Sequence, residues 1–87
     1  MSWNIKEKKS ILKSVKKLPV EILTIYGEAK DDLANEGPVP VGWDVCKIND
    51  NEYRLKLNYR YRIRYMVDIT IKIIGITYLG HRKDAYR

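Results

Sequence analysis

The stretch YRLKLNYRYRIRY, residues 53–65, constrains the fold more than any other part of this chain. Apolar or aromatic residues alternate with basic ones on both sides of its centre, and a period of two is typical of a strand with one buried face. Asparagine is common in turns, and Asn58 stands near the middle of the stretch. We therefore predict a β-hairpin with strands over 53–57 and 61–65 and a turn at 58–60.

A turn centred on Tyr59 also predicts which residues lie opposite each other. Apolar partners share one face, and the other face pairs cations with cations, namely Arg54 with Arg64 and Lys56 with Arg62. Directly opposed like charges destabilise a sheet by about 0.2–1 kcal/mol per pair. Such a face is expected either to be fully solvated or to bind an anion, and we favour the anion.

Composition limits the class of protein and of partner. The 87 residues suffice for a single domain, 1–87, with one modest core, and a hydrophobic fraction of 45% argues against disorder. The net charge of +6 favours a polyanionic partner. Every arginine lies in the second half of the chain, while the first 42 residues use lysine alone. Because the guanidinium group matches phosphate geometry, the second half is the expected anion-binding half.

Several classes of site have no support in the sequence. The single cysteine, Cys46, rules out an internal disulfide and suits a reducing cytosol. One histidine and one cysteine do not make a metal site of the usual spacing, and there is no glycine-rich phosphate loop, so we expect no metal and no cofactor. The longest apolar stretch, 69–79, is interrupted by polar residues, and the N-terminus lacks the apolar core of a signal peptide. We expect a cytoplasmic protein that does not enter a membrane.

The first half predicts two helices. Residues 6–17 place apolar side chains at helical spacing and carry lysines on the other side, which is typical of a solvated face or of a contact to a nucleic-acid backbone. A second helix runs from Pro19 to about Asn35, with a break after it at Gly37-Pro38. The alternation of Trp3, Asn4 and Ile5 predicts a short first strand. The two helices are expected to form an αα-hairpin.

The second half predicts strands at 43–48, in the central hairpin and at 69–79. The predicted fold class is α+β, with the N-terminal αα-hairpin packed on a three- to four-stranded antiparallel sheet.

The order of these elements, with the tandem motifs YRLKL and YRIRY and the terminal GHRKDAYR, resembles the RelE/ParE superfamily of toxins from bacterial toxin–antitoxin systems, and the RelE side most closely. The resemblance implies a microbial-RNase-like fold and the activity of an mRNA interferase. This is a ribosome-dependent endoribonuclease that cleaves mRNA through attack by the 2′-hydroxyl without a metal, and that a cognate antitoxin silences.

Carried over to this sequence, the resemblance implies two groups of site residues. The catalytic set is Lys56, Arg62, His81, Arg82 and Tyr86, and Arg54 matches a basic position that binds RNA. Arg60 and Arg64 exceed the family's usual pattern, and we assign them, with Lys83, to binding of the RNA backbone. Arginines would hold the phosphate oxygens where negative charge develops, and Lys56 or His81 would move protons. One departure stands out. Some relatives place a carboxylate base on the sheet, but residues 53–65 contain no acidic residue.

Three alternatives remain open at this stage. A ParE-like inhibitor of DNA gyrase or a catalytically inactive RNA-binding protein would share the fold. Independently of these, the four hairpin cations are compatible with a sheet face that is merely solvated. His81 is also compatible with an ordinary surface or capping residue, and Tyr86 with packing on the sheet edge.

Overall fold

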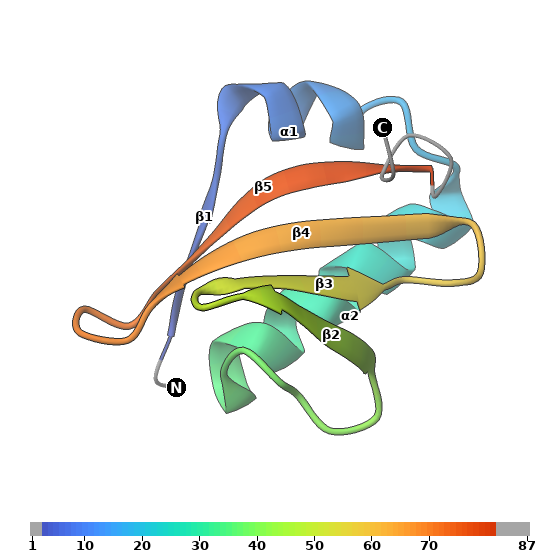
Figure 1. Cartoon of the computed structure of the whole chain (residues 1–87). Coiled ribbons are helices and arrows are strands. Elements are labelled where there is room, and N and C mark those ends of the chain that lie inside the picture. The colour runs from blue at the N-terminus through green and yellow to red at the C-terminus, as the bar shows by residue number, and fades with distance from the viewer. Residues whose placement is uncertain (1–2, 82–87) are drawn as a thin grey trace.

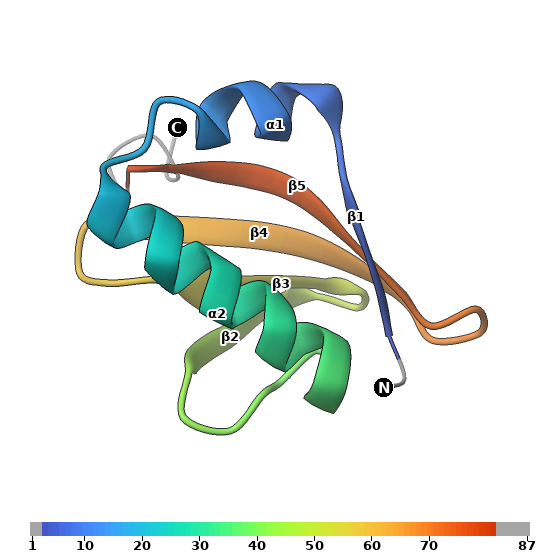
Figure 2. The ribbon, with the colours of Figure 1, turned by 180° about the vertical axis from the view of Figure 1, so that it is seen from behind.

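The computed structural model describes residues 3–81 (Figure 1). Two helices and five strands follow one another over this range, and they are β1 (Asn4–Glu7), α1 (Lys9–Val15), α2 (Val20–Glu36), β2 (Asp44–Asn49), β3 (Glu52–Lys56), β4 (Tyr61–Asp68) and β5 (Ile73–His81). The α2 helix crosses one face of the sheet, and α1 lies along β5 (Figures 1 and 2). The α+β class is as predicted.

The sheet is larger than the sequence predicted. Its strand order is β1-β5-β4-β3-β2, and β1 pairs with β5 in parallel while the other neighbours are antiparallel. The prediction of three or four antiparallel strands was therefore wrong. A parallel partner requires a long crossover connection, so the pairing of the N-terminal strand with the last strand leaves no trace in either local sequence.

The N-terminal helix is shorter than the predicted 6–17, because residues 4–7 pair with β5 as a strand. The αα-hairpin is not confirmed. The α1 helix contacts β5 and α2 contacts β1. Buried residues from both helices belong to one core cluster with the strands. Both apolar stripes are thus directed at the sheet, which offers a larger apolar surface than a single neighbouring helix.

The core lies between α2 and the sheet. Its largest fully buried side chains include Tyr26 and Tyr65. The Tyr65 ring stacks on Tyr53 with centroids 5.7 Å apart. The α2 helix ends at Gly37, whose φ of 98° and position against the Trp3 indole leave no room for a Cβ atom.

The register predicted for the central hairpin is confirmed. Arg54 lies opposite Arg64, and Lys56 lies opposite Arg62. The Leu57 amide donates a hydrogen bond of 2.9 Å to the Tyr61 carbonyl and closes the turn. Within the turn, the Asn58 Oδ1 atom accepts the amides of residues 60 and 61 at 2.8 Å each.

The last strand begins later than the predicted 69–79. Residues 69–72 form a turn in which the Asp68 carboxylate accepts the Thr70 amide at 3.0 Å. The pairing of β4 with β5 shifts between Arg64 and Tyr65, which leaves Thr77 as an extra residue on β5. Over residues 3–81, neither helix is long and apolar enough to cross a membrane.

Candidate nucleic-acid interface

One face of the sheet, on the side away from α2, gathers the basic side chains of the hairpin. Successive residues of a strand point to opposite faces, and the apolar partners of β3 and β4 pack in the core. The remaining positions therefore share the open side. We call this set the cationic face, and it consists of Arg54, Lys56, Arg62 and Arg64.

The cationic face is partly enclosed. Arg62 is only 5% exposed, and the other three members are half-buried. Arg62 lies opposite Gly80 on β5, where no side chain stands above the backbone. Buried guanidinium groups exert stronger fields than fully solvated ones because the local dielectric constant is lower. Arg62 is thus the member best placed to act strongly on a bound anion.

An aromatic side chain joins this face from β5. Tyr78 lies opposite Arg64, and its hydroxyl donates a hydrogen bond of 3.2 Å to the His81 carbonyl. A Cβ atom at Gly80 would stand 2.6 Å from this hydroxyl, so the Tyr78 ring extends over the glycine toward Arg62. Sequence reasoning missed Tyr78. The sequence does place Tyr78 in the last predicted strand. The one-residue shift in the β4–β5 pairing, however, decides which face of the sheet its side chain takes.

A carboxylate also reaches the cationic face. Asp44 on β2 lies opposite Lys56, and its Oδ2 atom is 3.4 Å from the Lys56 Nζ atom. The side chain of Asp44 is 66% exposed to solvent, and that of the half-buried Lys56 is 42% exposed. The central hairpin, residues 53–65, contains no acidic residue of its own. The acid comes from the neighbouring strand, whose pairing the local pattern does not reveal.

His81 is placed differently from the hairpin cations. It lies opposite Tyr61 in the β4–β5 register, and the two rings meet edge to face with centroids 5.6 Å apart. Because Tyr61 packs against the core, this register position belongs to the α2 side of the sheet. The catalytic role assigned to His81 stays a prediction.

Arg60 lies in the exposed β3–β4 turn, with its guanidinium group 5.1 Å from the centre of the Tyr59 ring. The remaining predicted site residues, Arg82, Lys83 and Tyr86, lie outside the described residues. The structure therefore brings together Arg54, Lys56, Arg62 and Arg64. Arg60 lies in the turn that connects β3 to β4.

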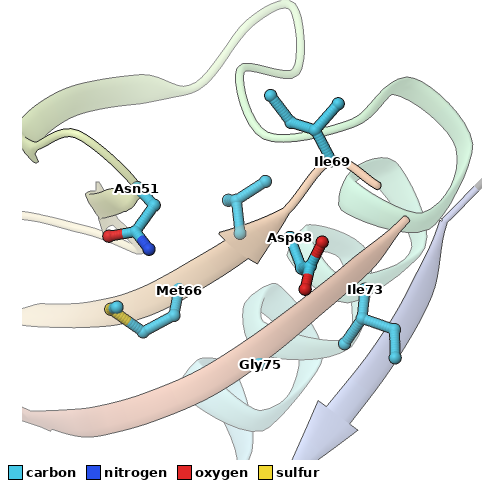
Figure 3. Close-up of a pocket in the computed structure, with 7 residues that line it drawn as sticks. Asn51, Met66, Asp68, Ile69, Ile73 and Gly75 are labelled. Atoms are coloured by element: carbon cyan, nitrogen blue, oxygen red, sulfur yellow. The ribbon is translucent and has the colours of Figure 1, made fainter. Parts of the chain in front are cut away.

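A pocket of about 540 Å³ opens at the other end of β4, near the β4–β5 turn (Figure 3). Its lining includes Met66, Ile69 and Ile73, and no basic residue contributes to it. A phosphate would find no counter-charge from these lining side chains. We therefore place the candidate site on the cationic face and not in this pocket.

The cationic face combines features that suit a phosphodiester. Guanidinium groups bind non-bridging oxygens, an ammonium group lies beside a carboxylate, and the aromatic residue Tyr78 lies opposite Arg64. Within residues 3–81, no group of three or more His, Cys, Asp or Glu side chains is arranged to hold a metal ion.

No family model matches the chain, and no curated protein sequence matches it either. Solved structures do. The chain is 28% identical to the archaeal RelE of a RelE–RelB complex from Pyrococcus horikoshii, with 94% of this chain and 97% of that chain covered and a TM-score of 0.80.

Two further structures share the fold at lower identity. The toxin RelE from E. coli, solved as a mutant in the free state, is 16% identical over 99% of this chain and 90% of its own, with a TM-score of 0.77. The match from a YoeB–YefM complex of Staphylococcus aureus is 16% identical over 92% of this chain and 97% of its own, with a TM-score of 0.74. The chain thus has a RelE-like fold and resembles RelE-type toxins over nearly its whole length.

Proposed function

We propose, from this likeness to RelE-type toxins, that the chain is the toxin of a type II toxin–antitoxin system and cleaves mRNA on the ribosome. The observation that carries the proposal is the cationic face, on which β3 and β4 align four basic side chains on the side of the sheet that α2 leaves open. A cross-strand row of like charges destabilises the free protein, and a polyanionic substrate offsets that cost.

The reaction proposed is transfer of a phosphoryl group within the RNA. The 2′-oxygen forms a bond to phosphorus, and the bond from phosphorus to the 5′-oxygen breaks, which leaves a 2′,3′-cyclic phosphate and a free 5′-hydroxyl. Arg62 and its neighbours hold the non-bridging oxygens, where negative charge increases in the transition state. The proposed mechanism uses no metal ion to form or break these bonds.

The reaction requires two proton transfers, and we assign both to the pair formed by Asp44 and Lys56. The Asp44 carboxylate accepts the proton of the 2′-hydroxyl, and the Lys56 ammonium donates one to the departing 5′-oxygen. The pair ends with neutral groups and returns to its charged form by exchange with water. His81, Arg82 and Tyr86 extend the proposed site through the family resemblance alone, and we further assign RNA binding to Lys83.

The partner proposed is a cognate antitoxin that covers the cationic face with acidic side chains. Support comes from the similar RelE protein of P. horikoshii, which was solved in complex with RelB. Complementary charge speeds the association of two proteins and suppresses wrong partners.

The test is single-turnover cleavage of mRNA on purified ribosomes. We expect Arg62→Ala to lower the rate by about 10²-fold or more, as loss of one donor to a developing oxyanion does. Because Arg62 is buried, Arg62→Lys serves as a second variant that keeps the charge and most of the volume. Asp44→Asn removes the proposed base, and Asp50→Asn in the exposed β2–β3 turn is its matched control.

Folding of each variant is checked by thermal unfolding. Cleavage at the wild-type rate by well-folded Arg62 and Asp44 variants would refute the assigned roles. A wild-type protein that leaves mRNA intact and blocks DNA supercoiling by gyrase would refute the nuclease altogether.

A further inference from the structure

A second basic surface lies beside the cationic face, on β1, α1 and the turn that follows. All of its lysines are exposed. We call it the lysine ridge, and it consists of Lys6, Lys8, Lys9, Lys13, Lys16 and Lys17.

The ridge is held outward by the packing of α1. Lys9, Lys13 and Lys16 recur at i, i+4 and i+7, which places them on one side of the helix. On the other side, Ile11 is buried and Val15 packs against the same core. Ile11 and Val15 of α1 are thus occupied within the protein, Leu12 is 48% exposed, and the lysine side faces outward.

The ridge has no acidic neighbour in its own segment to neutralise it. The only acidic residue between 6 and 17 is Glu7, and β-strand alternation directs it toward α2. There its Oε2 atom accepts a hydrogen bond of 2.7 Å from the Tyr26 hydroxyl and lies 3.4 Å from the Lys30 Nζ atom. A second ion pair joins Lys56 to Asp44, and neither of these two pairs involves a ridge lysine.

The ridge and the cationic face are neighbours. The α1 helix lies along β5 in both views of the molecule (Figures 1 and 2). On β5, Tyr78 and Gly80 pair with the cationic-face residues Arg64 and Arg62. One strand therefore separates the two basic surfaces, and a single polyanion can contact both.

We propose that the lysine ridge binds the phosphate backbone of double-helical RNA next to the strand held on the cationic face. The inference rests on the proposed function, because it assumes that the cationic face holds an mRNA strand. Lysines carry compact charges without a planar fork, so the ridge contacts phosphates and does not read bases. A membrane surface is disfavoured because a helix that binds one needs a broad free apolar side, and α1 leaves only Leu12 of its large apolar residues exposed.

The test compares two variants of the full chain with equal loss of charge. Lys9→Gln/Lys13→Gln removes two ridge charges, and glutamine keeps the helix propensity. Lys47→Gln/Lys72→Gln is the matched control, because both lysines are exposed and lie outside the ridge. The probe is a fully 2′-O-methylated RNA duplex, which the proposed nuclease cannot cut. Its binding is measured by fluorescence anisotropy as a function of salt concentration.

Each phosphate contact contributes about 0.9 to the slope of log K against log salt in B-form DNA, and we take a similar value for duplex RNA. We therefore expect the ridge variant to lower the slope by about 1–2, with an affinity loss of about tenfold, and the control to change it little. Equal changes in both variants would overturn the inference. So would unchanged duplex binding with weaker binding to phosphatidylserine vesicles or to polyglutamate.

The two proposals fail separately. The duplex measurement involves no cleavage, so a protein that binds duplex RNA through the ridge but leaves mRNA on ribosomes intact would refute only the proposed nuclease. A nuclease whose ridge variant binds the duplex as tightly as wild type would refute only the ridge.

Discussion

At the scale of single residues, two buried tyrosines link the helical layer to the strands. The Tyr26 hydroxyl of α2 donates to Glu7 of β1, and the Tyr65 hydroxyl of β4 donates to the Pro38 carbonyl after α2. Burial raises the pKa of Tyr26 well above its ordinary value, and the hydrogen bond to Glu7 adds to the rise. Burial also raises the pKa of Tyr65, with a smaller effect from Tyr53. Both phenols therefore stay protonated in the folded protein at pH values where they ionise in the unfolded chain.

These shifts predict a loss of stability in alkali. The folded pKa lies above the unfolded value of about 10, so the unfolded chain releases protons first and the free energy of unfolding falls as pH rises past 10. Each group contributes up to about 1.4 kcal/mol per pH unit. Urea unfolding between about pH 8 and pH 11.5 measures the slope. We expect Tyr65→Phe to make the slope clearly shallower and Tyr59→Phe, at an exposed position, to leave it unchanged. Equal slopes in all three proteins would contradict the expectation.

At the scale of elements, β5 connects the core, the cationic face and the parallel strand β1. The extra residue at Thr77 changes which side of the sheet the rest of β5 presents. Ile74 and Ile76 are buried before the shift, and Leu79 is buried after it. Tyr78 consequently joins the cationic face, while His81 takes the same side as Leu79. The bulge is thus the feature that separates the terminal histidine from the hairpin cations.

Two glycines of β5 provide a matched test of this strand. Gly75 and Gly80 both lie on the open side, opposite Met66 and Arg62. A Cβ atom at Gly75 meets nothing within 4 Å, whereas one at Gly80 meets the Tyr78 hydroxyl at 2.6 Å. We expect Gly80→Ala to displace the Tyr78 ring and to lower the free energy of unfolding by about 1–2 kcal/mol. Gly75→Ala should be neutral or stabilise by a few tenths of a kcal/mol.

A double-mutant cycle with Tyr78→Ala shows whether the displaced ring is the cause. If it is, Gly80→Ala has little effect once the ring is absent. A full effect of Gly80→Ala in the Tyr78→Ala background would mean that the β5 backbone, and not the ring, is sensitive to the substitution.

At the scale of the whole molecule, charge opposes folding. The chain carries a net charge of +6, and its basic residues concentrate on the cationic face and the lysine ridge. Self-repulsion of this kind weakens a compact state, and added salt screens it. The free protein is thus expected to be more stable when counter-ions or a polyanion are present.

Salt dependence measures this repulsion. We expect the free energy of unfolding to rise by about 1 kcal/mol between about 0.05 M and 0.5 M sodium chloride. Lys9→Glu/Lys13→Glu lowers the net charge from +6 to +2, since each substitution removes one positive charge and adds one negative charge. We expect a flatter salt response from that variant, and a wild-type response from Lys9→Arg/Lys13→Arg. An unchanged response in the glutamate variant would show that self-repulsion is not what salt relieves.

The sequence by itself determined the α+β class, the extent of α2 to within one residue at each end, the presence of the central hairpin, and its cross-strand pairs Arg54–Arg64 and Lys56–Arg62. All of these depend on contacts between residues close in the chain, where alternation and turn chemistry are visible. Only the tertiary structure decided that β1 pairs with β5, that Asp44 reaches Lys56, and that a bulge at Thr77 turns Tyr78 toward the cations and His81 away. These features depend on pairings between distant segments and on a one-residue shift, and neither changes the local pattern from which a sequence is read.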